Sequence, residues 1–176
     1  MDNFKIRSAI ARDAKSILEI YSHYIENTAA TFETQVPSLS DFAKRIDAIA
    51  GVYPYLLCEI DGEIVGYAYA SRHRERDAYR YDIDVSVYVK NGCQSRGIGT
   101  LLYQKLFEAL ANLNYYNAYA SITLPNEGSA ALHHKFGFCE IGIHHKTGYK
   151  FGKWHDVLWL EKPLKDHSAL ETTEET

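Results

Sequence analysis

The stretch VSVYVKNGCQSRGIGTLL, residues 85–102, decides the fold. It begins with the alternating apolar and polar residues of a β-strand, passes through a loop that contains glycines, and enters the apolar spacing of a helix. A strand, a glycine-containing turn and a helix start present backbone N–H groups of the kind that bind phosphate. The stretch therefore predicts an anion site at the start of the helix.

Two common phosphate motifs do not fit this loop. A dinucleotide-binding fingerprint needs a third glycine where this chain has Leu102. A P-loop needs a lysine followed by serine or threonine where this chain has Ile98 and Gly99. Two alternatives stay open for this motif: a pyrophosphate loop over residues 94–100, and a glycine turn that binds no ligand.

The rest of the chain shows strand and helix periodicity in the order β α α β β β α β α β β. Asp61-Gly62 is a strong hairpin signal, Ser38 or Ser40 caps the second helix, and Gly51 ends it. The order predicts a mixed α/β sheet with helices on its faces, as one domain over residues 1–165 with a C-terminal tail over 166–176. The expected elements are strands in 4–10, 53–60, 63–73, 78–89, 115–124 and 139–164 (two strands) and helices in 11–27, 39–51, 96–113 and 125–138.

Composition narrows the class of protein. The net charge of −4 over 176 residues argues against a nucleic-acid partner, which favours a basic surface. The charged N-terminus lacks the apolar segment of a signal peptide, and no run is long enough for a membrane helix. Cys58, Cys93 and Cys139 are odd in number and far apart. We expect a cytoplasmic protein with no nucleic-acid or membrane partner.

The segment QSRGIG, residues 94–99, resembles the Q/R-x-x-G-x-G/A motif of the Gcn5-related N-acetyltransferases (GNAT). The segments YSHYIENTAATFET, RERDAY, LPNEGSAALHHKFGF and GYKFGKWHDV are similar to the phosphinothricin and methionine sulfoximine N-acetyltransferases within that superfamily. The likeness spans roughly residues 5–162. It implies a GNAT fold, with a twisted, mostly antiparallel sheet of about seven strands, helices on both faces and a splayed central strand pair.

The resemblance implies acetyl-CoA as co-substrate. Asn126 is expected beside the cofactor, although its place after Pro125 is also typical of a helix N-cap. Lys135 is expected near the cofactor as well. The strand before the loop is expected to pair its backbone with the pantetheine arm, and the loop to hold the pyrophosphate. The candidate residues are Val87, Tyr88, Val89, Gln94, Ser95, Arg96, Gly97, Ile98, Gly99 and Thr100.

Acetyl transfer to an amine needs a group that takes up a proton, because only the neutral amine attacks a thioester. Asp84 lies on the polar face of its strand and is the candidate base, where the family pattern has a longer glutamate. The shorter side chain favours proton transfer through a water molecule, and a merely solvated acidic face stays the alternative. His133 is the candidate proton handler near the cofactor sulfur, or else an ordinary partly buried histidine. His134 is expected on the surface.

The prediction of the acceptor-binding residues depends on the same resemblance. Arginines can hold a substrate carboxylate in a bidentate manner, although runs such as 74–76 are often exposed charged loops. A metal made from His144, His145, His155 and Asp156 is not expected, because adjacent strand residues face opposite ways. The predicted acceptor-site residues are Phe32, Glu33, Arg74, Glu75, Arg76, Tyr79, Asp84, Val85 and Ser86.

These features predict an acetyl-CoA-dependent N-acetyltransferase that acts on the α-amino group of small amino-acid-like acceptors, with no metal. The resemblance also implies a homodimer. Two alternatives stay open. One is the same fold acting on another amine, such as a polyamine, an aminoglycoside or a protein N-terminus, and the other is a non-catalytic sensor of acyl-CoA.

Overall fold

The computed structural model describes residues 3–168, so most of the predicted tail at 166–176 lies outside the described residues. The elements appear in the predicted order. The strands are β1 (Phe4–Ser8), β2 (Tyr55–Ile60), β3 (Glu63–Arg72), β4 (Asp82–Val89), β5 (Asn117–Thr123), β6 (Cys139–Lys150) and β7 (Lys153–Pro163). The helices are α1 (Ala14–Asn27), α2 (Leu39–Ala50), α3 (Ile98–Ala111) and α4 (Glu127–Lys135), with 3₁₀ turns at Ala11–Asp13 and Asp77–Tyr79.

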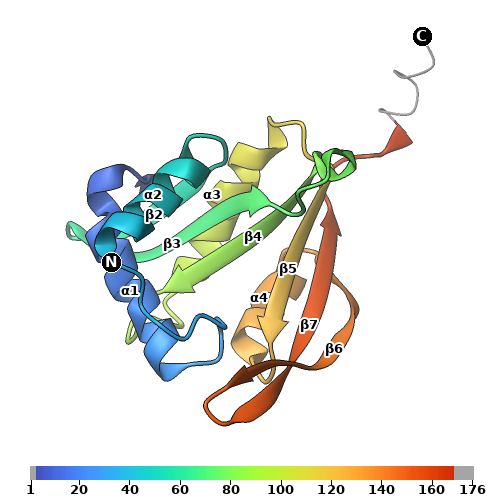
Figure 1. Ribbon diagram of the computed structural model, residues 1–176. Coiled ribbons are helices and arrows are strands. Elements are labelled where there is room, and N and C mark those ends of the chain that lie inside the picture. Colours follow the sequence, from blue (N-terminus) through green and yellow to red (C-terminus); the bar gives the residue numbers. More distant parts are fainter. Residues whose placement is uncertain (1–2, 169–176) are drawn as a thin grey trace.

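The strands form one seven-stranded sheet in the order β1-β2-β3-β4-β5-β7-β6 (Figure 1). Neighbouring strands run antiparallel except for β4 and β5, which run parallel. Within the described residues, β4 and β5 pair only where Asp82–Asp84 meets Asn117–Tyr119, and beyond that point they diverge. This arrangement confirms the predicted mixed sheet with a splayed central strand pair.

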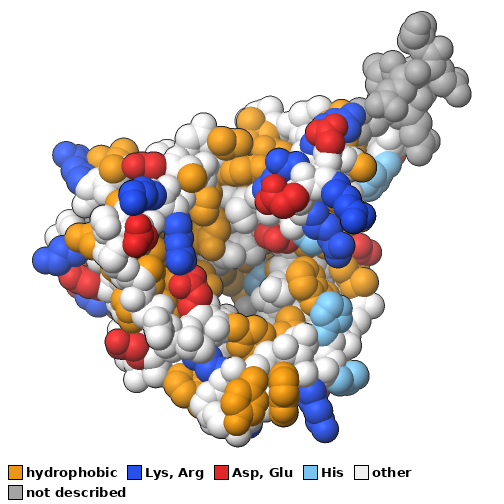
Figure 2. All heavy atoms as spheres, viewed as in Figure 1, with side chains coloured by type: hydrophobic (Ala, Val, Ile, Leu, Met, Phe, Trp, Pro, Cys, Tyr) orange, Lys and Arg blue, Asp and Glu red, His pale blue; other side chains and the backbone are white. Residues whose placement is uncertain are grey.

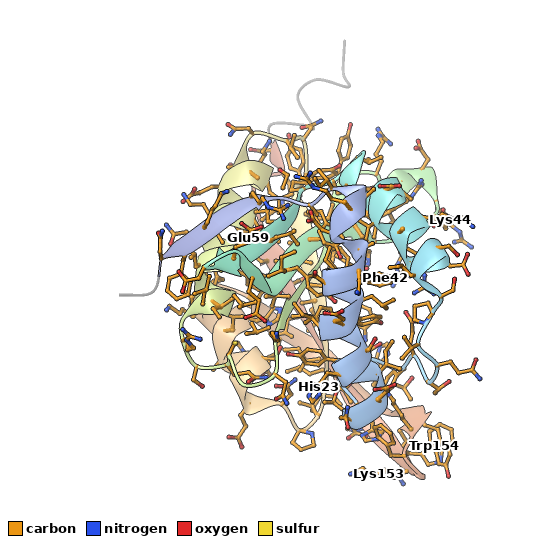
Figure 3. All side chains as sticks on the ribbon, turned by 90° about the vertical axis from the view of Figure 1, so that its left-hand side faces the viewer. His23, Phe42, Lys44, Glu59, Lys153 and Trp154 are labelled. Carbon is orange, nitrogen blue, oxygen red and sulfur yellow. The ribbon has the colours of Figure 1, made fainter. Side chains whose placement is uncertain are left out.

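Helices cover both faces of the sheet, as predicted. The stripe of α3 that contains Leu102, Leu106 and Leu110 is buried against the face that carries Ile83 and Val85 of β4. The opposite face packs against α1 and α2, where Phe42 of α2 lies 5.8 Å from the Tyr21 ring of α1 (Figure 3). β4 therefore presents its valines to one layer and its polar side chains to the other.

Most helix ends and turns agree with the local sequence signals that predicted them. Ser38 caps α2 by accepting a hydrogen bond from the Asp41 amide at 3.2 Å. Asp61 and Gly62 both take positive φ angles, 50° and 85°, as the hairpin turn requires. The predicted strand at 78–89 is shorter than expected, since residues 77–79 form a 3₁₀ turn and pairing begins at Asp82. No helix among residues 3–168 is long and apolar enough to cross a membrane.

A partly buried ion pair ties β1 to the start of α1. Arg7 Nη1 and Nη2 donate to the carboxylate of Asp13 at 2.6 and 2.8 Å, and Arg7 Nε donates to Glu59 at 2.7 Å. Asp13 also accepts the Ile10 amide at 2.9 Å. The hydrogen bond from Arg7 holds the pKa of Asp13 below its ordinary value.

We expect Asp13→Asn to lower the free energy of unfolding by about 2 kcal/mol at neutral pH, since it removes one partner of a partly buried pair. The native pKa lies below the unfolded one, so this stabilisation is present above the pKa of an unfolded aspartate and is lost as the pH falls through the native pKa. Urea denaturation of both proteins at pH 7 and in acid measures this. Asp77→Asn, at an exposed ion pair, is the control. Equal midpoints for wild type and Asp13→Asn at pH 7 contradict the expectation.

Candidate active site

A cleft opens where β4 and β5 separate. Its volume is about 600 Å³, and its walls come from β4, the start of α3, the end of β5 and α4. Figure 2 shows the molecule hollowed between the α1–α2 side and the β6–β7 hairpin, over the splayed strands. Arg96 belongs to the loop but does not line the cleft. The predicted cofactor residues that line it are Val87, Tyr88, Val89, Gln94, Ser95, Gly97, Ile98, Gly99, Thr100, Asn126 and Lys135.

The start of α3 has the geometry of an anion site. Gly97 is the N-cap and takes a φ of 81°, a conformation that favours glycine. The amides of the first helical turn, residues 98–100, have no acceptor within the helix, and the helix dipole adds positive potential there. A Cβ at Gly99 would lie 3.2 Å from Leu132 Cδ2 of α4. Glycine therefore keeps this corner of the cleft open.

The edge of β4 that faces the cleft carries backbone groups at alternate residues. The Lys90 amide donates to Val65 O on the β3 side, so the amides of Val87 and Val89 point the other way. Tyr24 of α1 reaches this edge, where its hydroxyl donates to Val89 O at 2.6 Å and accepts from the Val89 amide at 3.3 Å. Sequence reasoning missed Tyr24, since no local pattern separates it from the other tyrosines of α1.

Two groups of α4 face the cleft. Asn126 accepts the Ser129 amide at 3.1 Å and is therefore the N-cap of α4, while it also lines the cleft. His133 is buried, and its Nδ1 donates to the Ser129 carbonyl at 2.7 Å. Its Nε2 lies 2.8 Å from the hydroxyl of Tyr103, which is then the donor to a neutral ring. Burial lowers the pKa of His133, which favours that neutral ring.

Tyr103 is a second residue that sequence reasoning missed. It occupies the apolar stripe of α3 and reads as an ordinary core residue, yet its fully buried ring lines the cleft and its hydroxyl contacts His133. The wall of the cleft therefore contains a hydrogen bond from a phenol to a neutral imidazole. His134 lies on the surface as predicted, near Glu140.

Asp84 lies at the point where the strands part, on the polar face of β4. Its side chain is 34% exposed, and its Oδ1 lies 2.7 Å from Nδ1 of His73. Burial raises the pKa of Asp84, and the hydrogen bond from His73 partly offsets this. Ser86 and Tyr88 share this face, whereas Val85 packs in the core on the other side.

The structure brings some predicted acceptor residues together and separates others. Arg74 lies 5.3 Å from the ring of Tyr79 and donates through Nε to His73 Nε2 at 3.3 Å, which connects this loop to Asp84. Residues 74–76 are exposed, which agrees with both predictions for this run: a charged surface loop and a loop that contacts the acceptor. Glu33 is held on the side of α1 and α2, where its carboxylate accepts from Arg45 at 2.7 Å and from the Tyr21 hydroxyl at 3.0 Å.

The loop after α1 docks on the β6–β7 hairpin of the same chain. The ring of Phe32 fills the space that a Cβ would need at Gly148, and it lies 6.2 Å from the ring of His155. The buried Lys150 donates to Thr31 O at 2.8 Å. These contacts join the two segments that border the hollow in Figure 2.

The histidines near the hairpin do not converge. His155 is buried, with Nε2 3.1 Å from Lys150 O, whereas His145 is exposed beside Asp156 at 3.0 Å. His144 contacts the indole of Trp159. Among residues 3–168 no three such side chains form a group that could hold a metal ion.

Residues 6–159 match the acetyltransferase (GNAT) domain family. This chain belongs to that family. It is 39% identical to a phosphinothricin N-acetyltransferase of Streptomyces coelicolor, covering 91% of this chain and 96% of the relative. It is 32% identical to an L-methionine sulfoximine/L-methionine sulfone acetyltransferase of Salmonella typhimurium, covering 93% and 96%. A solved phosphinothricin acetyltransferase of Sinorhizobium meliloti in complex with acetyl-CoA shares the fold at a TM-score of 0.90 and 36% identity, covering 94% of this chain and 91% of that chain.

The cleft fits a coenzyme A thioester. The amides of residues 98–100 provide donors for a diphosphate at a helix N-terminus, and Gly99 leaves room that a Cβ would fill. In the part of the chain that the structure describes, no strand pairs with the cleft-facing edge of β4 at Val87, so its backbone can pair with an extended amide-containing arm as a neighbouring strand would. Both features lie in one cleft that ends near Asp84.

Proposed function

We propose that this GNAT protein is an acetyl-CoA-dependent N-acetyltransferase that acts on the α-amino group of small amino-acid-like acceptors, such as phosphinothricin or methionine sulfoximine. One observation carries the proposal: the cofactor cleft runs through the gap between β4 and β5 to the face where Asp84 lies. The relatives with names of this kind, at 32–39% identity over nearly the whole chain, support it.

When bound, acetyl-CoA supplies a thioester whose acetyl group passes from sulfur to the amine nitrogen as the C–N bond forms and the C–S bond breaks. Asp84 takes the proton of the amine, directly or through a water molecule. The raised pKa of Asp84 makes it a stronger base than an ordinary aspartate. The amide of Val87 points into the cleft and donates to the acetyl oxygen as negative charge develops there. The proton that Asp84 takes up passes to solvent and the leaving thiolate takes one up, and the Tyr103 hydroxyl and the His133 ring at the cleft wall are the proposed relay for this proton.

The acceptor contacts Ser86 and the loop that carries Arg74 and Arg76. Cations beside the site favour an acceptor with a carboxylate and disfavour polyamines and aminoglycosides, which carry positive charge. A domain that only senses acyl-CoA does not need a base. The half-buried Asp84 carboxylate, with its histidine partner at the end of the cleft, therefore favours an enzyme over a sensor.

Release of free CoA, followed with a thiol reagent, tests the proposal. The protein is incubated with acetyl-CoA and one candidate acceptor: phosphinothricin, methionine sulfoximine, each common amino acid, spermidine or an aminoglycoside. We expect turnover with at least one α-amino acid and none with the polyamine. Tight acetyl-CoA binding without turnover of any α-amino acid would refute the acceptor class.

We also propose that the protein is a cytoplasmic homodimer. The three cysteines are unpaired, which suits a reducing compartment. β6 is a twelve-residue strand at the edge of the sheet, and its first nine residues are exposed. The tip of the β6–β7 hairpin carries exposed apolar rings, including Trp154 (Figure 3). A second copy of this chain would cover the edge and the rings together.

We expect Trp154→Glu to weaken the dimer at least tenfold, because a charge replaces a large ring that is 58% exposed in the isolated chain. Sedimentation equilibrium over a range of protein concentrations measures the dissociation constant. Val52→Glu is the control, since Val52 is 64% exposed and follows α2, on another part of the chain. A wild-type protein that is monomeric throughout would refute the dimer.

A further inference from the structure

His73 holds the proposed base from the neighbouring strand end. It follows β3, whose Ser71 pairs with Asp84, and its Nδ1 lies 2.7 Å from Asp84 Oδ1. A carboxylate oxygen accepts, so Nδ1 carries the hydrogen. The other ring nitrogen, Nε2, accepts from Arg74 Nε at 3.3 Å. These two contacts assign one tautomer to a ring that stands between a guanidinium and a carboxylate.

The ring of His73 is fixed by aromatic neighbours from three other elements. It stacks on Tyr119 of β5 at 4.3 Å with an interplanar angle of 19°. Tyr79 and Trp159 of β7 each meet it edge-on at 6.3 Å. The imidazole side chain is only 8% exposed, against 34% for Asp84. Packing thus holds Nδ1 of His73 toward the Asp84 carboxylate. The hydrogen bond between them therefore costs the imidazole side chain little further conformational entropy.

The bond from His73 affects the charge state of the Asp84 carboxylate. A half-buried carboxylate in an aromatic surround tends to take up a proton, and a protonated Asp84 is not a base. A charge-assisted hydrogen bond favours the ionised form and fixes which oxygen faces the cleft. The other titratable or charged groups near the pair are Tyr69 on β3, Asp82 on β4, Arg74 and Tyr79 on the preceding loop, Tyr119 on β5 and Glu161 on β7.

We propose that His73 is a positioning residue for the acetyl transfer: its Nδ1–H bond orients the Asp84 carboxylate toward the acceptor amine. This inference rests on the proposed function, in which Asp84 is the base. Because His73 lies outside the cofactor cleft, its role concerns the base and leaves acetyl-CoA binding unchanged.

Three variants separate the hydrogen bond from the packing. His73→Phe keeps a ring against Tyr119 but has no donor, His73→Asn places an amide N–H near the position of Nδ1, and His73→Gln places it further out. We expect His73→Phe to lower kcat roughly tenfold at pH 7, with KM for acetyl-CoA unchanged. The acidic limb of its kcat/KM profile moves to higher pH, because the hydrogen bond that lowers the pKa of Asp84 is gone. His73→Asn restores both values and His73→Gln does not.

A second measurement does not depend on turnover. In protein labelled with ¹³C at aspartate carboxyls, the Asp84 signal, assigned with Asp84→Asn, titrates at higher pH in His73→Phe than in wild type or His73→Asn. A thermal melt and the acetyl-CoA dissociation constant confirm that each variant is folded. An Asp84 titration and pH profile that are the same in wild type, His73→Phe and His73→Asn would overturn the inference. If Asp84→Asn itself keeps full activity, the proposed function of Asp84 fails, whatever the titration shows.

Discussion

Asp84→Asn is expected to lower kcat by about 10³-fold while acetyl-CoA still binds with its wild-type affinity. The amide has the shape of the carboxylate and can keep a contact with His73, but it cannot take a proton from the acceptor amine. General base catalysis of this kind contributes about 10² to 10⁴ to a rate. Asp84 is not among the residues that line the cofactor cleft, so the loss falls on the chemical step. Steady-state kinetics and calorimetry with acetyl-CoA measure the two quantities.

Asp82→Asn is the matched control for this variant. Asp82 lies two residues away on the same face of β4, and its carboxylate accepts from Asn117 at 2.8 Å at the edge of the site. We expect less than about a threefold change in kcat for this variant, since a surface charge two residues away alters the pKa of Asp84 only weakly. Equal losses in both variants would mean that the charge of the strand face matters and that Asp84 has no specific role.

Gly99→Val is expected to weaken acetyl-CoA binding by roughly a hundredfold. A Cβ at this position would lie 3.2 Å from Leu132 Cδ2, and the two further methyl groups of valine have nowhere to go except into α4 or into the cleft. Either movement displaces the first-turn amides from the diphosphate, and two orders of magnitude correspond to about 2.7 kcal/mol. Isothermal titration with acetyl-CoA measures the dissociation constant.

Gly142→Val tests whether the effect belongs to the loop. Gly142 lies on β6, where an added Cβ meets nothing within 4 Å, so the same change of residue fits without displacement. We expect the dissociation constant for acetyl-CoA to stay within about twofold of wild type. If Gly99→Val binds acetyl-CoA as tightly as Gly142→Val, the diphosphate does not lie at the start of α3.

Much of the fold was predictable because the local signals agree with one another. The alternation in β4, the glycines before α3 and the Asp61-Gly62 turn each require a particular backbone, and the structure has it. The pairing of β2 with β3 followed from that turn, whereas the splay of β4 from β5 came from the family resemblance. Local periodicity carries no information about which strands become neighbours.

The candidate site was less predictable, and the misses share a physical cause. Tyr24, His73 and Tyr103 reach the site from α1, from the end of β3 and from α3, so only the folded chain brings them near β4 and α4. Tyr103 in addition sits at a core position of its helix, where an aromatic ring needs no functional reason. Residues on the motif itself, such as Gly97 and Asn126, were found because their role depends on their immediate neighbours.

The central claim is that the gap between β4 and β5 aims a coenzyme thioester at the face of Asp84. A crystal structure of the protein with acetyl-CoA and an unreactive acceptor analogue tests it most directly. We expect the diphosphate on the amides of residues 98–100, the pantetheine arm along the Val87 edge of β4, and the thioester carbon between Asp84 and the Tyr103–His133 pair. A coenzyme bound outside this gap, or a thioester on the side of the sheet away from Asp84, would contradict it.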